Sequence, residues 1–330
     1  MTRAYLAFTE KGLALAQKLA SALPGTVARC GHGGPGLADW AAEQFAHADA
    51  LIFVGAVGIA VRAIAPHCRN KAVDPAVVVL DECGHFAVPI LSGHLGGAND
   101  LARALAAVCG AVPVITTATD ANGVFAVDAW ARHQNCAVLE PERIKKVSGA
   151  LLAGRTVRFA SDWPIAGSPP AGLAEDAAAP ELALTLCPAG DALHLVPRIG
   201  VLGVGCRRGT GADTLAEAFA AFCAQAGFAP QCIAAAASID LKQNEAGLLA
   251  FCQSRGWPVE FFTAEQLRQA PGSFTPSAFV QSVTGVDNVC ERAAVLAAGG
   301  PLVFHKFART GVTFALAARP FSPDWRWQHV

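Results

Sequence analysis

The sequence predicts an α/β protein in which two Rossmann-like, three-layer lobes with mostly parallel sheets are joined by a small middle domain or linker. Three observations support this fold class. The chain has 330 residues, which is too long for one ordinary core. It is 53% hydrophobic and only 15% charged, so large buried cores can form. β-branched or aromatic runs alternate with Ala- and Leu-rich stretches, as strands and helices do around a parallel sheet.

The first α/β lobe is expected over residues 1–140. Its predicted strands are RAYLAF, ALIFVG, AVVVL and VPVIT, and its predicted helices span 11–23, 37–46 and 94–108. Thr9 is a suitable N-cap for the first of these helices.

A linker or small middle domain is expected over 141–196, because the pattern weakens there and the stretch WPIAGSPPAGLAEDAAAP is rich in Pro, Ala and Gly. The second α/β lobe is expected over 197–330. Its predicted strands are GVLGVG, LVFHKF and TFALAA, and its predicted helices span 212–226, 242–253 and 285–297.

Composition excludes several classes of partner. The formal net charge of -1 creates no general attraction for nucleic acid or an anionic membrane. Apolar stretches are interrupted well before the roughly 20 residues that a membrane-spanning helix needs, and the first apolar run is too short for a secretory signal. The eleven cysteines form no CxxC pair and no zinc-type cluster. We therefore expect a cytoplasmic protein with reduced thiols and no nucleic-acid or membrane partner.

The segment GAVGIAVR places Gly55 and Gly58 where a predicted strand turns into a helix. Backbone amides and a helix N-terminus can face an anion at such a turn, and Arg62 favours a carboxylate. The alternative is a tight turn that needs small residues. The segment is neither a P-loop nor a GxGxxG fingerprint.

The segment LDECGHFAVPILSGHLGGAND combines two histidines with three acids. Histidine titrates near neutral pH and a carboxylate can orient it, so proton transfer is one interpretation; solvated acids and a helix start are the other. No metal site is expected, because no HExxH pattern is present. The candidate residues are Asp81, Glu82, His85, Ser92, His94, Gly96, Gly97, Asn99 and Asp100.

A third segment, TTATDANG, follows the predicted strand VPVI. Helix capping explains one of its polar side chains, and ligand contact would explain the others; they are Thr116, Thr117, Thr119 and Asp120. Loops at the carboxyl ends of parallel strands meet beside one crevice. We therefore expect the three segments of the first lobe to share a single site.

In the second lobe, GVGCRRGTG places Cys206, Arg207 and Arg208 after a strand. Its glycine spacing does not fit a dinucleotide fingerprint, whereas adjacent arginines suit carboxylates. Cys206 lacks the His and Asn pattern of a nucleophile. In ASIDLKQNEAGL, Ser238 and Lys242 would face a ligand, unless the segment is only a capped helix start.

These segments, together with VTGVDNVCERAA, resemble in order the signature segments of the cobalt-precorrin-5A hydrolases, also called cobalamin biosynthesis protein G. The second-lobe segments are shared with a smaller stand-alone protein of the aerobic cobalamin pathway. The resemblance implies a hydrolase acting on a carbon-carbon bond. It would open the ring-A δ-lactone of cobalt-precorrin-5A with water and release acetaldehyde to give cobalt-precorrin-5B.

The resemblance also implies a substrate with many carboxylates, which dispersed cations would bind: Arg62, Lys71, Arg207, Arg208, Lys242 and Lys306. Cobalt arrives inside this substrate, so neither a cofactor nor a protein metal site is expected. In the mechanism we infer, His85 or His94 activates water, and glycine amides or Thr hydroxyls stabilise the oxyanion. Asp81, Glu82 or Asp100 would orient the histidine.

Two other functions stay open at this point. One is a non-catalytic carrier of a corrin intermediate, which the second lobe encourages. The other, a nucleotide-dependent oxidoreductase or transferase, is disfavoured because no cofactor fingerprint appears. A homodimer and contacts with neighbouring enzymes of the cobalamin pathway are also left open.

Overall fold

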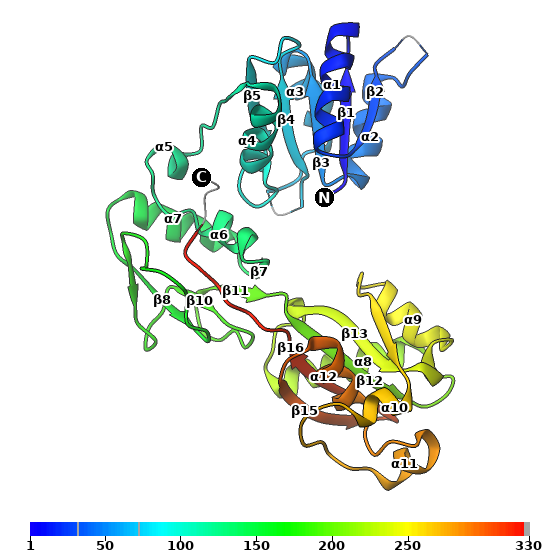
Figure 1. Ribbon diagram of the computed structural model, residues 1–330. Coiled ribbons are helices and arrows are strands. Elements are labelled where there is room, and N and C mark those ends of the chain that lie inside the picture. The colour runs from blue at the N-terminus through cyan, green and yellow to red at the C-terminus, as the bar shows by residue number, and fades with distance from the viewer. Residues whose placement is uncertain (32, 72, 327–330) are drawn as a thin grey trace.

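A computed structural model describes residues 1–31, 33–71 and 73–326. Three sheets follow one another along the chain, and they form a first lobe, a middle domain and a second lobe (Figure 1). Most of their strand pairs are parallel. The predicted fold class, two mostly parallel α/β lobes around a smaller unit, is confirmed.

The sheet of the first lobe has the order β2-β1-β3-β4-β5-β6. Strands β1 to β4 are parallel, whereas β5 runs antiparallel to β4, and β6 is parallel to β5. The sequence analysis predicted β1, β3, β4 and β6 but not β2 or β5. The bounds are β1 Arg3–Ala7, β2 Thr26–Arg29, β3 Ala50–Val54, β4 Ala76–Leu80, β5 Phe86–Leu91 and β6 Val112–Pro113.

Alternating apolar residues in these strands build a core on each face of the sheet. Tyr5 and Ile52 belong to the core under α1 (Glu10–Ala22) and α4 (Ala98–Cys109), and Leu6 and Phe53 belong to the opposite core, which includes Trp40. Helices α2 (Leu37–His47) and α3 (Val57–Ile64) cover that second face. Thr9 caps α1 as predicted, since its Oγ1 accepts a hydrogen bond from the amide of Gly12 at 3.0 Å.

The middle domain is a five-stranded sheet of order β7-β11-β10-β8-β9, with helices α6 and α7 on its core. Helix α6 and strand β7 lie inside the range predicted for the first lobe, so the boundary at residue 140 does not coincide with the change of sheet. The bounds are α5 Ala118–Ala121, α6 Val127–His133, β7 Cys136–Val138, α7 Ile144–Leu152, β8 Val157–Ser161, β9 Leu173–Glu175, β10 Leu182–Leu184 and β11 Leu193–Pro197.

The sheet of the second lobe has the order β14-β13-β12-β16-β15 and carries helices on both faces. Helix α8 has the predicted bounds, whereas α9 and α12 begin later than expected. The bounds are β12 Gly200–Cys206, α8 Ala212–Ala226, β13 Ile233–Ile239, α9 Ala246–Gln253, β14 Val259–Phe262, α10 Ala264–Arg268, α11 Ala278–Thr284, α12 Cys290–Ala298, β15 Leu302–Arg309 and β16 Val312–Ala318.

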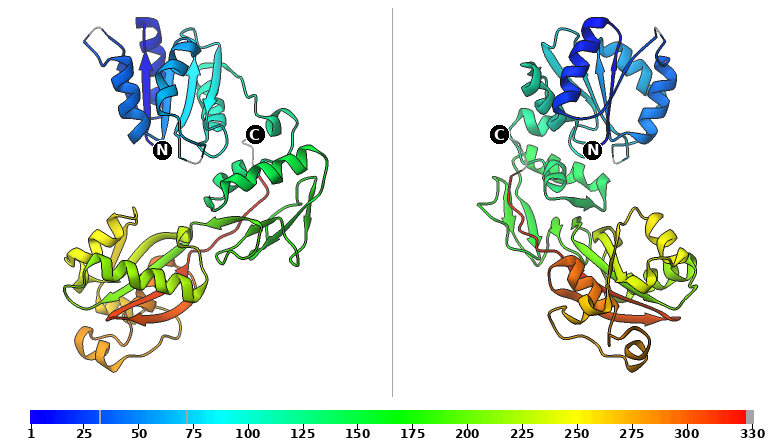
Figure 2. Two further views of the ribbon diagram at one scale, coloured as in Figure 1. Left: turned by 180° about the vertical axis from the view of Figure 1, so that it is seen from behind. Right: turned by 45° about the vertical axis from the view of Figure 1, so that its right-hand side comes forward.

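The chain leaves the second lobe beside the point where it enters. The amide of Arg319 donates to the carbonyl of Ile199 at 2.9 Å, and the following segment runs back along the middle domain (Figure 2). There Trp325 stacks on Trp130 with ring centroids 5.0 Å apart. The last described residues, which were expected in the second lobe, therefore complete the core of the middle domain. Within the described part of the chain, no helix is long and apolar enough to cross a membrane.

Candidate functional site

Strand β5 separates the predicted site residues of the first lobe into two groups. Ala87 pairs with Leu80 at the carboxyl end of β4, and Leu91 pairs with Val77 near its amino end. A strand of six residues spans about 20 Å. Residues before β5 therefore lie at one edge of the sheet and residues after it lie at the other. The expectation that the three segments share one site is wrong, because it placed them all at the carboxyl edge.

The carboxyl edge holds the glycine turn. A Cβ atom on Gly55 would lie 2.6 Å from Cδ2 of Phe8, so packing alone requires a glycine there. Gly58 has no such constraint, since its nearest contact would be Arg62 Nη1 at 3.6 Å. The exposed Arg62 reaches back to the carbonyl of Gly58 in its own helix, at 3.5 Å.

Asp81 at the same edge organises a turn. Its carboxylate accepts hydrogen bonds from the amides of Cys83 at 2.9 Å and His85 at 2.8 Å. Burial raises the pKa of Asp81, but the backbone amides outweigh it and hold that pKa below its usual value. The side chain of His85 is 70% exposed. Glu82 accepts from Thr9 at 2.7 Å. These acids therefore stabilise a solvated turn.

The side chains of Asp81, Cys83 and His85 offer ligand atoms that lie within 4.8 Å of one another. However, the Asp81 carboxylate is committed to backbone amides, and Lys11 Nζ lies 2.9 Å from Cys83 Sγ. An ammonium group beside the thiol opposes a second cation. We assign no metal to this turn.

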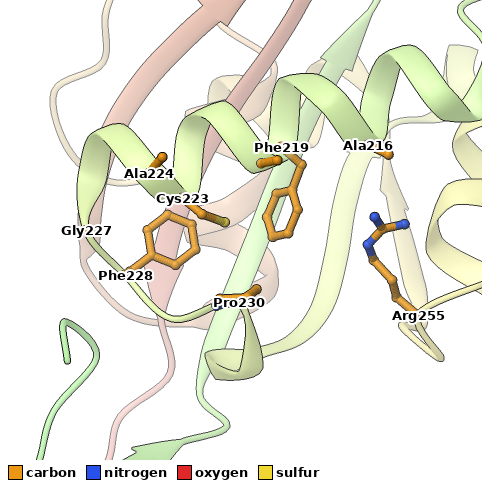
Figure 3. A pocket seen from close by; sticks show the side chains of 9 residues that line it. Ala216, Phe219, Cys223, Ala224, Gly227, Phe228, Pro230 and Arg255 are labelled. Carbon is orange, nitrogen blue, oxygen red and sulfur yellow. The ribbon is translucent and has the colours of Figure 1, made fainter. Parts of the chain in front are cut away.

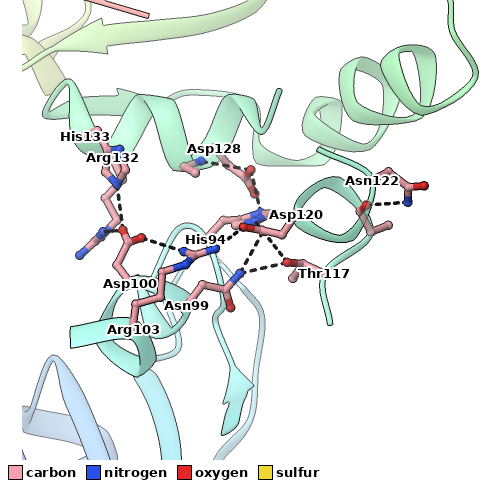
Figure 4. A network of polar contacts seen from close by, with 12 residues as sticks. His94, Asn99, Asp100, Arg103, Thr117, Asp120, Asn122, Asp128, Arg132 and His133 are labelled. Carbon is pink, nitrogen blue, oxygen red and sulfur yellow. Dashed lines mark hydrogen bonds and ion pairs between the residues drawn. The ribbon is translucent and has the colours of Figure 1, made fainter. Parts of the chain in front are cut away.

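The amino edge gathers a partly buried polar network at the junction with the middle domain (Figure 4). We call it the His94 cluster. His94 Nε2 lies 2.5 Å from Asp120 of α5, and its Nδ1 lies 3.1 Å from Asp128 of α6. One imidazole therefore links the loop before α4 to the middle domain. The cluster consists of His94, Asn99, Asp100, Arg103, Thr117, Asp120, Asp128, Arg132 and His133.

The cluster holds His94 as a cation. Burial lowers the pKa of His94, but the hydrogen bonds and charges of Asp128 and Asp120 outweigh it and raise that pKa to about 9. Burial raises the pKa of Asp120, and hydrogen bonds from Thr117, His94 and Arg103 outweigh it and lower that pKa to about 2. At neutral pH His94 is an imidazolium between two carboxylates. In this state it cannot accept a proton, so the predicted role as a base does not fit it.

Asp100 organises the other half of the cluster. It pairs with Arg132, with His133 Nε2 at 2.8 Å and with Arg103 Nη1 at 3.3 Å. Arg103 also reaches Asp120 at 2.6 Å, so it joins the two halves. Contrary to the prediction, His94 is oriented by Asp120 and Asp128, neither of which the sequence analysis chose for that role. Of these ion pairs, only the one between Asp100 and Arg103 could be inferred from the sequence, because the two residues are three positions apart on one helix.

The glycines of SGHLGG permit close packing around this cluster. A Cβ atom on Gly96 would lie 2.4 Å from that of Ser92. Gly97 has φ +83°, and its Cβ would lie 2.4 Å from Cζ of Arg132. Arg132 therefore crosses the loop over a glycine to reach Asp100. Ser92, itself at φ 54°, donates from Oγ to the carbonyl of Asp74 at 2.9 Å.

Only some of the polar residues of the third predicted segment belong to the His94 cluster. Thr117 donates to Asp120 at 2.5 Å, and the buried Asn99 donates to Thr117 at 3.0 Å. Thr116 is exposed. Thr119 is buried, and its Oγ1 has no hydrogen-bond partner among the described residues. The structure thus brings His94, Asn99, Thr117 and Asp120 together as expected, and leaves Thr116 outside the cluster.

A cavity of about 590 Å³ opens at the carboxyl ends of β12 and β13 in the second lobe. We call it the basic cavity. Cys206 lines it, but burial raises the pKa of this thiol, so it stays protonated and is a poor nucleophile. Ser238 is buried and donates to the carbonyl of Val204 at 2.7 Å, and it does not line the cavity. The cationic lining residues are Arg207, Arg208, Lys242, Lys306 and Arg309.

An open hollow of about 600 Å³ lies beside α8, between Phe219, Cys223, Phe228 and Arg255 (Figure 3). Among the described residues that line it, Arg255 alone is charged, and its guanidinium lies 4.1 Å from the ring centre of Phe251. None of the predicted site residues lies there. We assign no function to this hollow.

Comparison with known proteins covers most of the chain. Residues 39–120, 125–187 and 200–317 match the families described as Cobalamin synthesis G N-terminal, Cobalamin biosynthesis central region and Cobalamin synthesis G C-terminus. The chain is 36% identical over 344 residues to the cobalt-precorrin-5A hydrolase of Salmonella typhimurium, covering 95% of this chain and 96% of the relative. It is 29% identical to the cobalt-precorrin-5A hydrolase of Priestia megaterium, covering 82% and 79%.

A shorter relative matches part of the chain. Protein CobE from Sinorhizobium sp is 35% identical over 120 residues, which is 36% of this chain and 78% of that protein. The three family matches follow one another in the order of the three sheets. With the Salmonella relative matched almost from end to end, these findings place the chain in the cobalamin biosynthesis protein G family.

Proposed function

We propose that this protein is a cobalt-precorrin-5A hydrolase, which opens the ring-A δ-lactone of its substrate with water and releases acetaldehyde. The observation that carries the proposal is the 36% identity with a relative of that name over 95% of the chain. Cobalt belongs to the substrate, so the proposal includes no cofactor. The proposal includes a cytoplasmic location, which the eleven scattered cysteines without a CxxC pair favour.

We place the reaction at the His94 cluster. Opening a lactone builds negative charge first on the carbonyl oxygen and then on the leaving oxygen, and fixed donors stabilise such charge. The imidazolium of His94 supplies a positive charge and a proton, provided that the substrate takes the place of one carboxylate. His94 thereby acts as an acid in lactone opening. The hydroxyl group that opening sets free then loses its proton, its carbon-carbon bond to the macrocycle breaks in a retro-aldol-like step, and acetaldehyde leaves while the macrocycle keeps the electron pair and takes up a proton.

The base that activates water is assigned to Asp128. Its side chain accepts hydrogen bonds from His94 and from the amide of Ala129 at 3.2 Å. An ionised carboxylate has about four acceptor positions, so Asp128 can also accept from a water molecule. Asp120 is a poor base, because its low pKa opposes protonation.

The test is acetaldehyde release from anaerobically prepared cobalt-precorrin-5A, with and without the purified full-length chain. Release that depends on the protein, together with lactone opening, supports the hydrolase. Tight binding of the pigment without acetaldehyde would instead establish a carrier. The observation that favours this second function is the basic cavity, whose described lining includes five cations and no acid. Helix α11, which lines it, lies far from α5 and α6 along the molecule (Figure 1).

A further inference from the structure

We propose that the basic cavity of the second lobe is a binding site for a polycarboxylate macrocycle, separate from the His94 cluster where the reaction is placed. The proposal rests on the proposed function for the chemical class of the ligand. It goes beyond that function by assigning the protein a second place where such a ligand is held.

The charges around the cavity lack counter-charges. Of the five cations that line it, only Lys242 has a carboxylate within 4.0 Å in the described structure, Glu245 at 3.0 Å. No described lining residue is acidic. In the His94 cluster, by contrast, Arg103 and Arg132 both pair with Asp100. Several cations that face one cavity without partners create a positive potential there, which attracts an anionic ligand.

The cavity also has an apolar wall. Phe279 and Val283 line it and are 73% and 62% exposed. They are four residues apart in α11, so they lie on the same side of that helix. Large apolar side chains on a concave surface indicate a ligand with an apolar face. An apolar plane with carboxylates around its edge would satisfy both the wall and the cations.

The walls of the cavity are held together by one buried carboxylate. Glu291 in α12 is fully buried and accepts hydrogen bonds from the amide of Thr275 at 2.6 Å and from the amide of Lys306 at 2.8 Å. The first contact fixes the segment that leads into α11, and the second fixes the strand that carries Lys306 and Arg309. The apolar wall and two of the cations are therefore positioned before any ligand binds.

The position of the cavity separates it from the reaction. Strand β12 begins at Gly200 beside the middle domain and ends at Cys206 in the cavity, about 20 Å further away. Helix α11 lies at the end of the molecule remote from the first lobe (Figure 1). A macrocycle in the cavity cannot at the same time contact His94 of the same chain. The site therefore holds the pigment before or after the reaction.

The test uses uroporphyrin III, a planar tetrapyrrole with eight carboxylates, and coproporphyrin III, which has four. Each is titrated into the full-length chain at about 0.15 M salt, and porphyrin fluorescence is followed. We expect saturable binding that is tighter for uroporphyrin. Arg208→Gln should weaken it about tenfold, since a charge-assisted hydrogen bond to a carboxylate is lost. Phe279→Ser should weaken binding of both porphyrins.

The matched control is Arg268→Gln, which removes the same charge from an exposed position of the second lobe outside the cavity. It should change the affinity less than twofold. Equal weakening by Arg268→Gln and Arg208→Gln, or no binding by the unchanged chain, would overturn the proposal.

The acetaldehyde assay separates this proposal from the proposed function. Cavity-dependent porphyrin binding by a chain that releases no acetaldehyde would refute the hydrolase and leave the cavity assignment standing. Acetaldehyde release by a chain without cavity-dependent binding would support the hydrolase and refute the cavity assignment. Thermal unfolding of each variant shows whether a loss of binding reflects a loss of folding.

Discussion

His94 and Asp128 lie 3.1 Å apart, Nδ1 to Oδ1, although one belongs to the first lobe and the other to a helix of the middle domain. The same imidazole contacts Asp120 through its other nitrogen. His94 is thus one of the residues of the first lobe through which its charges meet those of the middle domain, another being Asp100. Its substitution should change both the chemistry and the stability of the junction, and the two effects can be measured separately.

The two histidines chosen from the sequence should differ in their effect on turnover. His94→Asn removes the proposed acid, and loss of such a group typically costs 10²- to 10⁴-fold in rate. His85→Ala should keep turnover within about twofold of the unchanged chain, because His85 is exposed at the opposite edge of the sheet. Initial rates of acetaldehyde release test both variants. A fully active His94→Asn, or an inactive but folded His85→Ala, contradicts the placement of the reaction.

The stability of the chain should fall as the pH rises above neutrality. The pKa of His94 is raised in the folded state from 6.5 to about 9. The stabilisation is therefore complete below pH 6.5 and is lost as the pH rises through about 9. Its size is on the order of 2 to 3 kcal/mol. Urea unfolding at pH 6.5 and 9.5 tests this.

His94→Gln is the reference for this experiment, because it cannot titrate. The difference in urea midpoint between the unchanged chain and His94→Gln should shrink at the higher pH. Asp120 affects the stability of the chain at acidic pH. Its pKa is lowered from 3.8 to about 2, so its contribution to the free energy of unfolding is present above pH 3.8 and is lost as the pH falls through about 2. A midpoint difference that is independent of pH would show that folding does not raise the pKa of His94.

Gly97→Ala should be strongly destabilising. The residue has φ +83°, and a Cβ there would meet the guanidinium of Arg132 at 2.4 Å. Backbone strain and the displaced ion pair together should cost on the order of 1 to 3 kcal/mol and also reduce turnover. The control is Gly149→Ala in α7, where a Cβ meets nothing within 4 Å. That change should stabilise the chain slightly, and similar unfolding midpoints for the two variants would refute the steric argument.

Ser238→Ala tests a residue that the sequence predicts to contact a ligand but that the structure buries inside the sheet. Its Oγ donates to the carbonyl of Val204 inside the sheet, so the alanine variant should lose about 1 kcal/mol of stability. Porphyrin affinity should be unchanged, because Ser238 does not line the basic cavity. Weakened porphyrin binding by a variant with normal stability would return Ser238 to the set of ligand contacts.

The sequence was sufficient for the fold class because both lobes repeat strong local patterns, such as the buried run of β4 and the helical period of α8. It was insufficient for β5. The run FAVPIL contains Pro89, which disfavours a central strand, and its antiparallel direction depends on pairing with β4, which no local pattern records. This single strand decides which candidate residues meet.

The same distinction applies to the sites. His94, Asn99 and Asp120 were recognisable because polar side chains followed apolar runs, and the structure brings them together. Asp128 was not recognisable, since it approaches from another unit and has no unusual neighbours in the sequence. Phe279 likewise looks like an ordinary core residue of a helix. Only the fold shows that it is exposed in a cavity.

The hydrogen bond between Arg319 and Ile199 has an evolutionary consequence. The second lobe enters and leaves the rest of the chain through two adjacent strands, β12 and β16, so it is an insertion between two pieces of the middle domain. An insertion whose ends lie side by side can be gained or lost by recombination without disrupting the strands and core of the domain that carries it. The second lobe can therefore be exchanged or removed as one unit, with its two ends leaving a gap that a short loop can close.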